Sequence, residues 1–370
     1  MTAESKAYSI AMMGDIMLDR EVGRRFQSDP GAFAFDNMRT LLEPYDIVFA
    51  NLENPVALSG SPHPVQDPNV CFCAKPDTLT ILKNLGISAV SIANNHLLDY
   101  GESALVETTE HLDAQGIHWA GAGRNYDEAN RPIILTVNSY KVAILCHVFI
   151  YSASTERARA NAPGLADYRV RKILRQIRRL KEAGHHVLVS LHWGIEYQFY
   201  PLPYQMKWAR RMIDAGASLI IGHGPHYPQG IEGYNGGTII YSLGNFIFDE
   251  PYKYTRRSFI YGVAISGEGR PVKADIFPVY LEQALPRIVT GREAERLVKL
   301  VNDLSNRYPR LEQKSWRRIN NIWFSDIVWR VQKMKSWKFV WLPPLSFYFS
   351  LGIKNYLRKL LPGRLKKWIK

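Results

Sequence analysis

The sequence predicts an α/β fold with mixed sheets, followed by a basic helical tail. Short β-rich runs alternate with amphipathic helical stretches, and two further pairs of β runs are typical of hairpins. The charge distribution separates the tail, because 15 of the 47 Lys and Arg residues but only two of the 34 acidic residues lie in residues 310–370. We therefore predict a main domain over residues 1–308 and a tail over residues 309–370.

The predicted elements follow one another in a regular order. The strands are expected at 8–13, 46–50, 89–93, 187–191, 218–221 and 238–242, and the helices at about 76–85, 101–115, 168–183, 204–215 and 292–306. The hairpins pair 132–137 with 141–147, and 259–266 with 272–280. Because hairpin strands are antiparallel whereas strands joined through helices are parallel, the sheets should be mixed.

Composition excludes several classes of protein. Residues 1–309 carry equal numbers of basic and acidic side chains, which argues against a nucleic-acid groove on the main domain. Three cysteines, Cys71, Cys73 and Cys146, form no disulfide framework, and we expect Cys71 and Cys73 on a buried strand. The sequence shows no evident signal peptide, and the apolar window 339–353 is too short to span a membrane. These features predict a cytoplasmic protein.

Polar residues follow the predicted strands at the points where they end. They are Gly14-Asp15, Asn51-Leu52-Glu53, Asn94-Asn95-His96, the run from His192 to Glu196, the turn GHGPH at 222–226, and Leu243-Gly244-Asn245. Each motif alone could be a turn, a loop or a core histidine. In α/β sheets, however, ligands bind outside the carboxyl ends of the strands. Their recurrence at successive strand ends therefore predicts one shared metal site.

The chemistry of this site follows from its donor atoms. The candidate ligands are Asp15, Glu53, Asn95, His192, His223 and His226. Mixed nitrogen and oxygen ligands without thiolate suit Mn, Fe or Zn, bound as one or two divalent ions. If Glu53 bridges, the set can serve two ions about 3.5–4 Å apart, the spacing used for phosphoester hydrolysis.

The remaining residues of the motifs suggest a proton donor. His96 could act as general acid toward a leaving group, with Asp99, three residues on, holding its other ring nitrogen. An alternative makes Asn94 or Asn95 the N-cap of the 101–115 helix. The predicted substrate-binding residues are Asn51, Asn94, Glu196, Asn245, Arg256 and Arg257. The two arginines could bind an anion, although a solvated charged loop explains them equally well.

The ordered motifs GDIML, NLE, IANNH, HWGIE, GHGPH and SLGNF resemble the CapA/PgsA family of poly-γ-glutamate capsule proteins over about residues 8–280. The resemblance implies the calcineurin-like metallophosphoesterase fold, an α-β-β-α sandwich. It also implies a metal site at the candidate ligands above, with His96 as catalytic acid. Met17 stands where that superfamily usually carries a histidine, so one metal position lacks an imidazole unless Glu196 compensates.

The tail interleaves six tryptophans with Lys and Arg in amphipathic helical patterns. Such segments bind anionic membrane surfaces, although docking on a capsule synthase or packing on the main domain would also fit. We therefore expect a metal-dependent phosphoester hydrolase of capsule or exopolymer biosynthesis, held at the inner face of the membrane. Its substrate would be phosphorylated or polyglutamate-like, and no nucleic acid is expected as partner. The alternatives are a γ-glutamyl amide hydrolase and a non-catalytic accessory of a polymer synthase.

Overall fold

The computed structural model describes residues 6–150 and 155–306. The predicted tail and its membrane-binding patterns lie outside the described residues. Within them, no helix combines the length and the apolar character needed to cross a bilayer.

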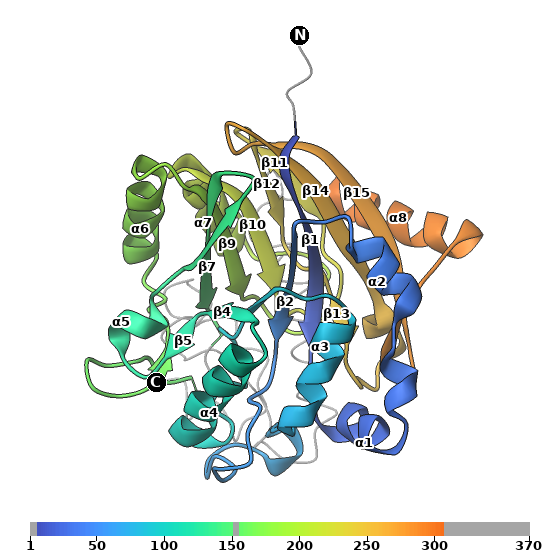
Figure 1. The fold of residues 1–370 in the computed structure, drawn as a ribbon. Coiled ribbons are helices and arrows are strands. Elements are labelled where there is room, and N and C mark those ends of the chain that lie inside the picture. The colour runs from blue at the N-terminus through green and yellow to red at the C-terminus, as the bar shows by residue number, and fades with distance from the viewer. Residues whose placement is uncertain (1–5, 151–154, 307–370) are drawn as a thin grey trace, which may run out of the picture. The chain divides into compact units, whose positions relative to one another are not determined.

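Two large β-sheets form the centre of the main domain (Figure 1). The eight-stranded sheet has the order β16-β15-β14-β1-β2-β3-β4, with β13 pairing to β1. Its strands are β1 (Lys6–Ile16), β2 (Ile47–Leu52), β3 (Ala89–Ser91), β4 (His118–Ala120), β13 (Asn245–Ile247), β14 (Arg257–Ser266), β15 (Pro271–Glu282) and β16 (Leu285–Ile288).

The six-stranded sheet has the order β11-β12-β10-β9-β7-β6. Its strands are β6 (Ile133–Val137), β7 (Tyr140–Val148), β9 (His186–His192), β10 (Ala217–His223), β11 (Ile231–Tyr234) and β12 (Gly237–Ile240). A further pair joins β5 (Ala122–Gly123) to β8 (Gly164–Leu165).

Both large sheets are mixed, as the sequence predicted. Strands β1 to β4 run parallel, as do β7, β9, β10 and β12. The two predicted hairpins are present as the antiparallel pairs β6–β7 and β14–β15. The parallel strands matter most for function, because their carboxyl ends lie at one edge of each sheet.

Helices cover the outer faces of both sheets. The helices are α1 (Arg20–Ser28), α2 (Asp36–Leu42), α3 (Thr80–Asn84), α4 (Gly101–Ala114), α5 (Tyr126–Ala129), α6 (Val170–Glu182), α7 (Pro203–Asp214) and α8 (Gly291–Ser305), with 3₁₀ turns η1 (Pro30–Phe33), η2 (Pro68–Val70), η3 (Pro76–Leu79) and η4 (Lys253–Arg256). Helices α2, α3 and α4 contribute Met38, Leu82 and Leu105 to the larger core, which includes the eight-stranded sheet. Helices α6 and α7 share a second core with β9 and β10. The predicted α-β-β-α sandwich is thereby confirmed.

Side-chain alternation in β9 and β10 explains how the sheets present residues to each other. Leu188 of β9 and Leu219 of β10 belong to the core that the two sheets share, whereas Val189 and Ile220, the next residues, belong to the core under α6 and α7. Strand side chains alternate between faces with a period of two. His192 and His223, each four residues beyond those leucines, therefore face the opposite sheet where their strands end.

Two sequence predictions about local structure are wrong. Cys71 and Cys73 lie in an irregular segment between η2 and η3, not on a strand, and only Cys71 is buried. Neither Asn94 nor Asn95 caps the helix α4, whose N-cap position is Tyr100. The chain makes an additional turn over residues 95–100 before the helix starts, which places both amides away from its end.

Candidate metal centre

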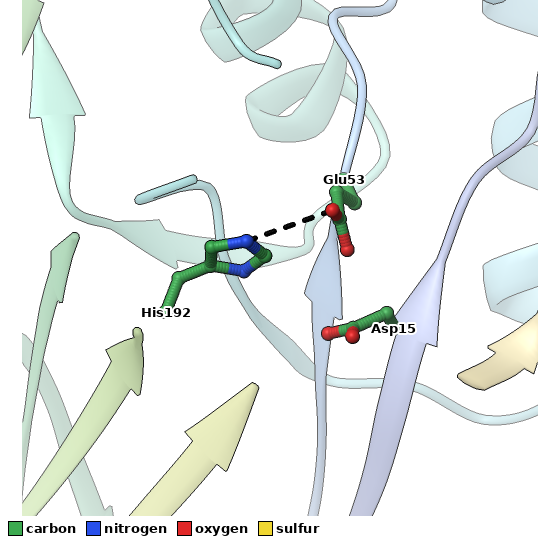
Figure 2. A group of neighbouring side chains, drawn as sticks. All are labelled: Asp15, Glu53 and His192. Carbon is green, nitrogen blue, oxygen red and sulfur yellow. Dashed lines mark ion pairs between the residues drawn. The ribbon is translucent and has the colours of Figure 1, made fainter. Parts of the chain in front are cut away.

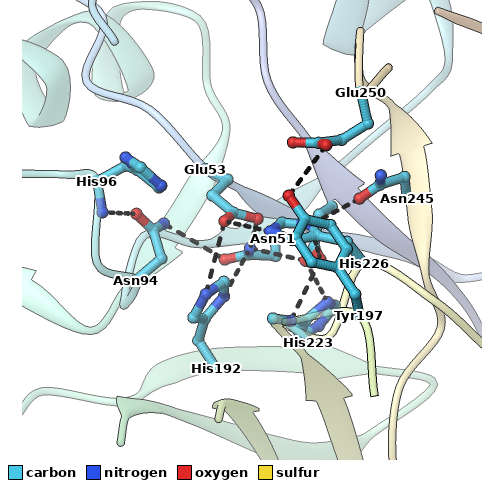
Figure 3. A network of polar contacts seen from close by, with 12 residues as sticks. Asn51, Glu53, Asn94, His96, His192, Tyr197, His223, His226, Asn245 and Glu250 are labelled. Atoms are coloured by element: carbon cyan, nitrogen blue, oxygen red, sulfur yellow. Dashed lines mark hydrogen bonds and ion pairs between the residues drawn. The ribbon is translucent and has the colours of Figure 1, made fainter. Parts of the chain in front are cut away.

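The candidate site lies where the carboxyl ends of strands from both sheets meet (Figure 3). Asp15 comes from β1, Glu53 directly follows β2, and His192 and His223 are the last residues of β9 and β10. All four side chains are almost completely buried. The structure thus brings together acidic groups from one sheet and imidazoles from the other.

Asp15 is the most extensively contacted residue of the site. Its Oδ1 lies 3.1 Å from His223 Nδ1 and accepts a 2.9 Å hydrogen bond from Asn51 Nδ2, while Oδ2 accepts one of 3.2 Å from the Gly224 N–H. Gly14 makes this position accessible, because a Cβ there would stand 1.9 Å from the Gly244 carbonyl oxygen. The absence of a side chain therefore lets β1 approach the 244–245 segment closely.

Glu53 lies between two imidazoles. Its Oε1 is 3.6 Å from His192 Nε2 and 3.5 Å from His226 Nε2. Asp15, Glu53 and His192 each offer a ligand atom, and these atoms all lie within 4.8 Å of one another (Figure 2). One cation placed among them could contact all three residues.

The GHGPH turn directs its second histidine back toward the carboxylates. Gly224 has φ +103°, and His226 has φ +56°, a conformation that a residue with a Cβ adopts only at a cost. His226 Nδ1 lies 3.4 Å from Asp15 Oδ2 and 2.8 Å from Asn245 Oδ1. The strain is therefore located where the imidazole is fixed between Asp15 and Glu53.

Several atoms of the site that could bind a metal ion make no hydrogen bond. Among the described residues, Glu53 Oε1, His192 Nε2 and His223 Nε2 are buried and have no hydrogen-bond partner. A buried polar group left in this way costs about 1–3 kcal/mol, so native structures rarely tolerate several together. A divalent cation among Asp15, Glu53 and His192 would satisfy Glu53 and His192. The residues present therefore fit a metal ion.

The site is also electrostatically polarised. Burial opposes charge on Asp15, but hydrogen bonds from His223 and His226 outweigh it and hold the pKa of Asp15 far below its usual value. Burial alone would lower the pKa of His226, yet the neighbouring Glu53 and Asp15 carboxylates raise it well above normal. For His192, burial dominates and lowers the pKa. His192 is accordingly neutral near pH 7, the state in which an imidazole binds metal.

His96 stands beside this centre with a fixed orientation. Its Nδ1 lies 2.7 Å from Asp99 Oδ2, and its backbone N–H donates to Asn94 Oδ1 over 3.1 Å. Asp99 is fully buried and also accepts hydrogen bonds from the Phe72 N–H and Gln66 Nε2. The geometry leaves His96 Nε2 as the ring nitrogen that can transfer a proton to substrate.

The other predicted residues divide into inner and outer groups. Asn51 is central, since its Nδ2 lies 2.9 Å from Asp15 Oδ1 and 3.2 Å from His192 Nδ1. Asn94 donates to the Leu52 carbonyl oxygen over 2.7 Å, and Asn95 is buried in the same loop. Met17 is buried, and its sulfur accepts from the Asp19 N–H over 3.2 Å, so this position carries a core side chain.

The predicted outer residues lie farther from the carboxylates. Glu196 is half-buried, and its charge contributes to the raised pKa of Glu53, after burial and Asp15. Arg257 is exposed at the start of β14, and its side chain hydrogen-bonds Tyr227, while Arg256 ends η4. Among the described residues, neither arginine forms a hydrogen bond or an ion pair with the candidate ligands.

Aromatic residues that the sequence analysis did not select surround the site. The Phe72 ring lies 4.3 Å from the His96 ring, and the Phe248 ring lies 4.9 Å from the His226 ring, measured between centroids. The Tyr197 hydroxyl donates to Glu250 Oε2 over 3.0 Å (Figure 3), and the Tyr197 ring lies 5.9 Å from the His226 ring between centroids. No local pattern marks these residues, although aromatic density in 196–205 and 249–258 is a weak signal.

The sequence is similar to those of known capsule synthesis proteins. A family model described as "Bacterial capsule synthesis protein PGA_cap" matches residues 9–250. The "Capsule biosynthesis protein CapA" of Bacillus anthracis is 31% identical over 296 residues, covering 78% of this chain and 71% of the relative. The "PGA biosynthesis protein CapA" of Bacillus subtilis is 31% identical over 288 residues, covering 77% and 74%.

Among solved structures, a 5'-nucleotidase precursor from Thermus thermophilus is similar at a TM-score of 0.46 and 10% sequence identity. The likeness covers 83% of this chain and 60% of that one. A similarity this distant has no bearing on activity or ligand.

Proposed function

The chain belongs to the bacterial capsule synthesis protein family PGA_cap, and from that membership and the site geometry we propose that it is a metal-dependent phosphoester hydrolase. It would act in the biosynthesis of a capsule or a poly-γ-glutamate-like polymer. The observation that carries the proposal is the set of buried, hydrogen-bond-free donor atoms on Glu53, His192 and His223 beside a fixed histidine.

The residues that would hold metal are Asp15, Glu53, His192, His223 and His226, with Asn95 as a further candidate on its loop. We propose one or two ions of Mn, Fe or Zn, because the ligands are carboxylate and imidazole without thiolate. A bound ion would supply Lewis acidity toward a phosphoryl oxygen and an activated water. Glu53, whose Oε1 lies 3.6 Å from His192 Nε2 and 3.5 Å from His226 Nε2, would supply its carboxylate to both ions if two were bound.

His96 would protonate the leaving-group oxygen. Asp99 accepts from Nδ1–H and fixes the plane of the ring, so the proton given to the leaving group would be a second one, carried on Nε2. The Phe72 ring packs against one side of the His96 ring and further restricts its movement. The protein thereby positions a proton donor next to the cations that would bind the phosphoryl group.

Metal analysis combined with hydrolysis assays tests the proposed function. Full-length protein loaded with Mn²⁺ should release phosphate from simple phosphoesters, lose this activity on chelation, and regain it when Mn²⁺ is restored. Poly-γ-glutamate is assayed in parallel. Cleavage of the polymer without phosphate release would identify an amide hydrolase and contradict the proposal. Stoichiometric metal without either activity would favour a non-catalytic accessory and contradict it as well.

We also propose that residues 309–370 bind anionic membrane from the cytoplasmic side, on the basis of their sequence alone. Each Lys or Arg near such a surface contributes about 1 kcal/mol, and this segment carries a large excess of them. Full-length protein should sediment with vesicles containing phosphatidylserine at low salt and be released at high salt. A chain truncated after residue 308 should stay in the supernatant. Sedimentation of the truncated chain with the same vesicles would contradict this proposal.

A further inference from the structure

We propose that Arg20 binds an anionic phosphoryl oxygen of the substrate beside the metal centre. The inference rests on the proposed function and adds to it a residue that the sequence analysis did not consider. Arg20 is the first residue of α1, five positions after Asp15.

The backbone of Arg20 is strained. Its φ of +50° lies in the left-handed region, which disfavours residues with a Cβ. Such conformations persist where the surrounding structure holds them, and they are concentrated at binding and catalytic sites. An arginine whose only task was to cover the surface would not need this conformation.

The side chain of Arg20 is fixed by a partner distant in sequence. Its Nη2 forms a salt bridge with Asp249 Oδ1, and Asp249 Oδ2 accepts a 3.1 Å hydrogen bond from the Glu21 N–H. The carboxylate is therefore anchored to the start of α1 and to the guanidinium together. Arg20 is preorganised, which lowers the entropy that a ligand must remove.

The guanidinium also lies against the aromatic rings that support the two key histidines. Its Cζ is 4.5 Å from the centroid of the Phe72 ring and 5.9 Å from that of Phe248. Phe72 contacts the His96 ring on one side of the site, and Phe248 contacts the His226 ring on the other. Arg20 is thus separated from both the candidate proton donor and a candidate metal ligand by a single aromatic side chain.

The hydrogen-bonding capacity of Arg20 is mostly unused. Its only hydrogen-bond partner among the described residues is Asp249, and its Nε is buried without one. A guanidinium offers five donors in a planar fork that matches phosphate oxygens. The side chain keeps 29% of its surface exposed, so it is not sealed within the ion pair. The positive charge of Arg20 also acts on the Glu250 carboxyl group.

A purely structural role for Arg20 makes a different prediction. If Arg20 only holds α1 against the segment after β13 through its ion pair, then Arg20→Gln and Asp249→Asn should lower the unfolding temperature to a similar extent. Neither would then change the affinity for an anion. The two roles are therefore separable by measuring stability and binding on the same variants.

The test titrates inorganic phosphate into the Mn²⁺-loaded full-length protein and follows binding by calorimetry, with metal content measured for each variant. We expect Arg20→Gln to weaken phosphate binding by about 10- to 100-fold, the effect of losing a hydrogen bond to a charged group. Arg20→Lys should recover part of the affinity. Arg24→Gln, on the same helix but mostly exposed and paired with Glu21, is the matched control and should bind as the unmodified protein does.

Asp249→Asn keeps the guanidinium and should retain phosphate affinity within about threefold, even where stability falls. Unchanged phosphate binding in Arg20→Gln, or no phosphate binding by the unmodified metal-loaded protein, would overturn the assignment. Arg20-dependent phosphate binding without any phosphoester hydrolysis would instead uphold Arg20 and refute the proposed hydrolase function. The two proposals therefore fail in distinguishable ways.

Discussion

Replacing Glu53 with Gln is expected to abolish metal binding and hydrolysis while leaving the metal-free protein at least as stable as the unmodified one. Glu53 is fully buried, and its Oε1 makes no hydrogen bond among the described residues. Burial raises the pKa of Glu53 well above its usual value, and the charge of Asp15 adds to this effect against the opposing influence of His226. In the absence of metal, the ionised carboxylate of Glu53 therefore destabilises the folded state.

The sign of the stability change follows from linkage. Because the folded-state pKa of Glu53 lies above the unfolded one, folding favours the protonated form, and ionisation lowers stability as pH rises above the ordinary Glu pKa. Gln has nearly the same shape and no charge to bury. Near pH 7 the metal-free Glu53→Gln protein should thus unfold at the same temperature or at a higher one.

With metal bound, the unmodified protein should instead be more stable than Glu53→Gln. An ion that binds the folded state at about 100 times its Kd stabilises it by about 2.7 kcal/mol, and only the unmodified protein should gain this. Loss of a charged ligand should weaken metal affinity by at least about 100-fold, since even residues that only support ligands change it by 10- to 100-fold. Thermal unfolding with and without Mn²⁺, together with metal analysis, measures both effects.

Glu102→Gln is the matched control, because Glu102 is exposed on α4 and is not a candidate ligand. It should preserve the metal-induced shift and the activity. Full metal occupancy in Glu53→Gln would contradict the site described here. So would a metal-free variant markedly less stable than the unmodified protein.

The parts of the site predictable from sequence are those that depend on local rules. His192 and His223 could be placed because strand side chains alternate and both residues end a β-rich run. Asp15, Asn51 and Glu53 followed from the same argument applied to β1 and β2. The rule that ligands gather at the carboxyl ends of strands then joined them without knowledge of the sheet order.

The residues missed by sequence reasoning depend on long-range packing. Arg20 meets Asp249 across 229 positions of the chain, and Phe72 reaches His96 from a segment without regular structure. Nothing in the residues next to Arg20 distinguishes it from Arg24 or Arg25. Arg256 and Arg257 are conspicuous in the sequence because they follow the last motif, whereas the contacts of Arg20 depend on how distant segments pack.

The expected cap by Asn94 or Asn95 failed for a related reason. A residue of this type before a helix is usually its N-cap, but an Asn can also bond to backbone groups nearby. Asn94 does so here, accepting from the His96 N–H while donating to the Leu52 carbonyl oxygen on β2. Its amide fixes the loop that carries His96, and α4 begins later at Gly101.

Removing the imidazole of His96 should reduce hydrolysis selectively for poor leaving groups. General acid catalysis contributes about 10²–10⁴-fold where the departing oxygen is strongly basic, and little where it leaves readily as a stable anion. We therefore expect His96→Ala to lose about that factor on an alkyl phosphate and far less on p-nitrophenyl phosphate. Metal content should be unchanged, because His96 Nδ1 is directed to Asp99 and not to the candidate metal ligands.

Asp99→Asn should produce the same selectivity in weaker form. The amide can still accept from the Phe72 N–H, but it no longer places a negative charge beside Nδ1. That charge favours the His96 ring with a proton on both nitrogens, the form that can donate from Nε2. His118→Ala, at an exposed position on β4, is the control and should behave as the unmodified protein on both substrates. Equal losses on the two phosphoesters would show that His96 holds the ground state or the fold instead of donating a proton. In that case the site would need another acid, and Glu250, half-buried and hydrogen-bonded to Tyr197, with a pKa that burial raises, is a candidate for that role.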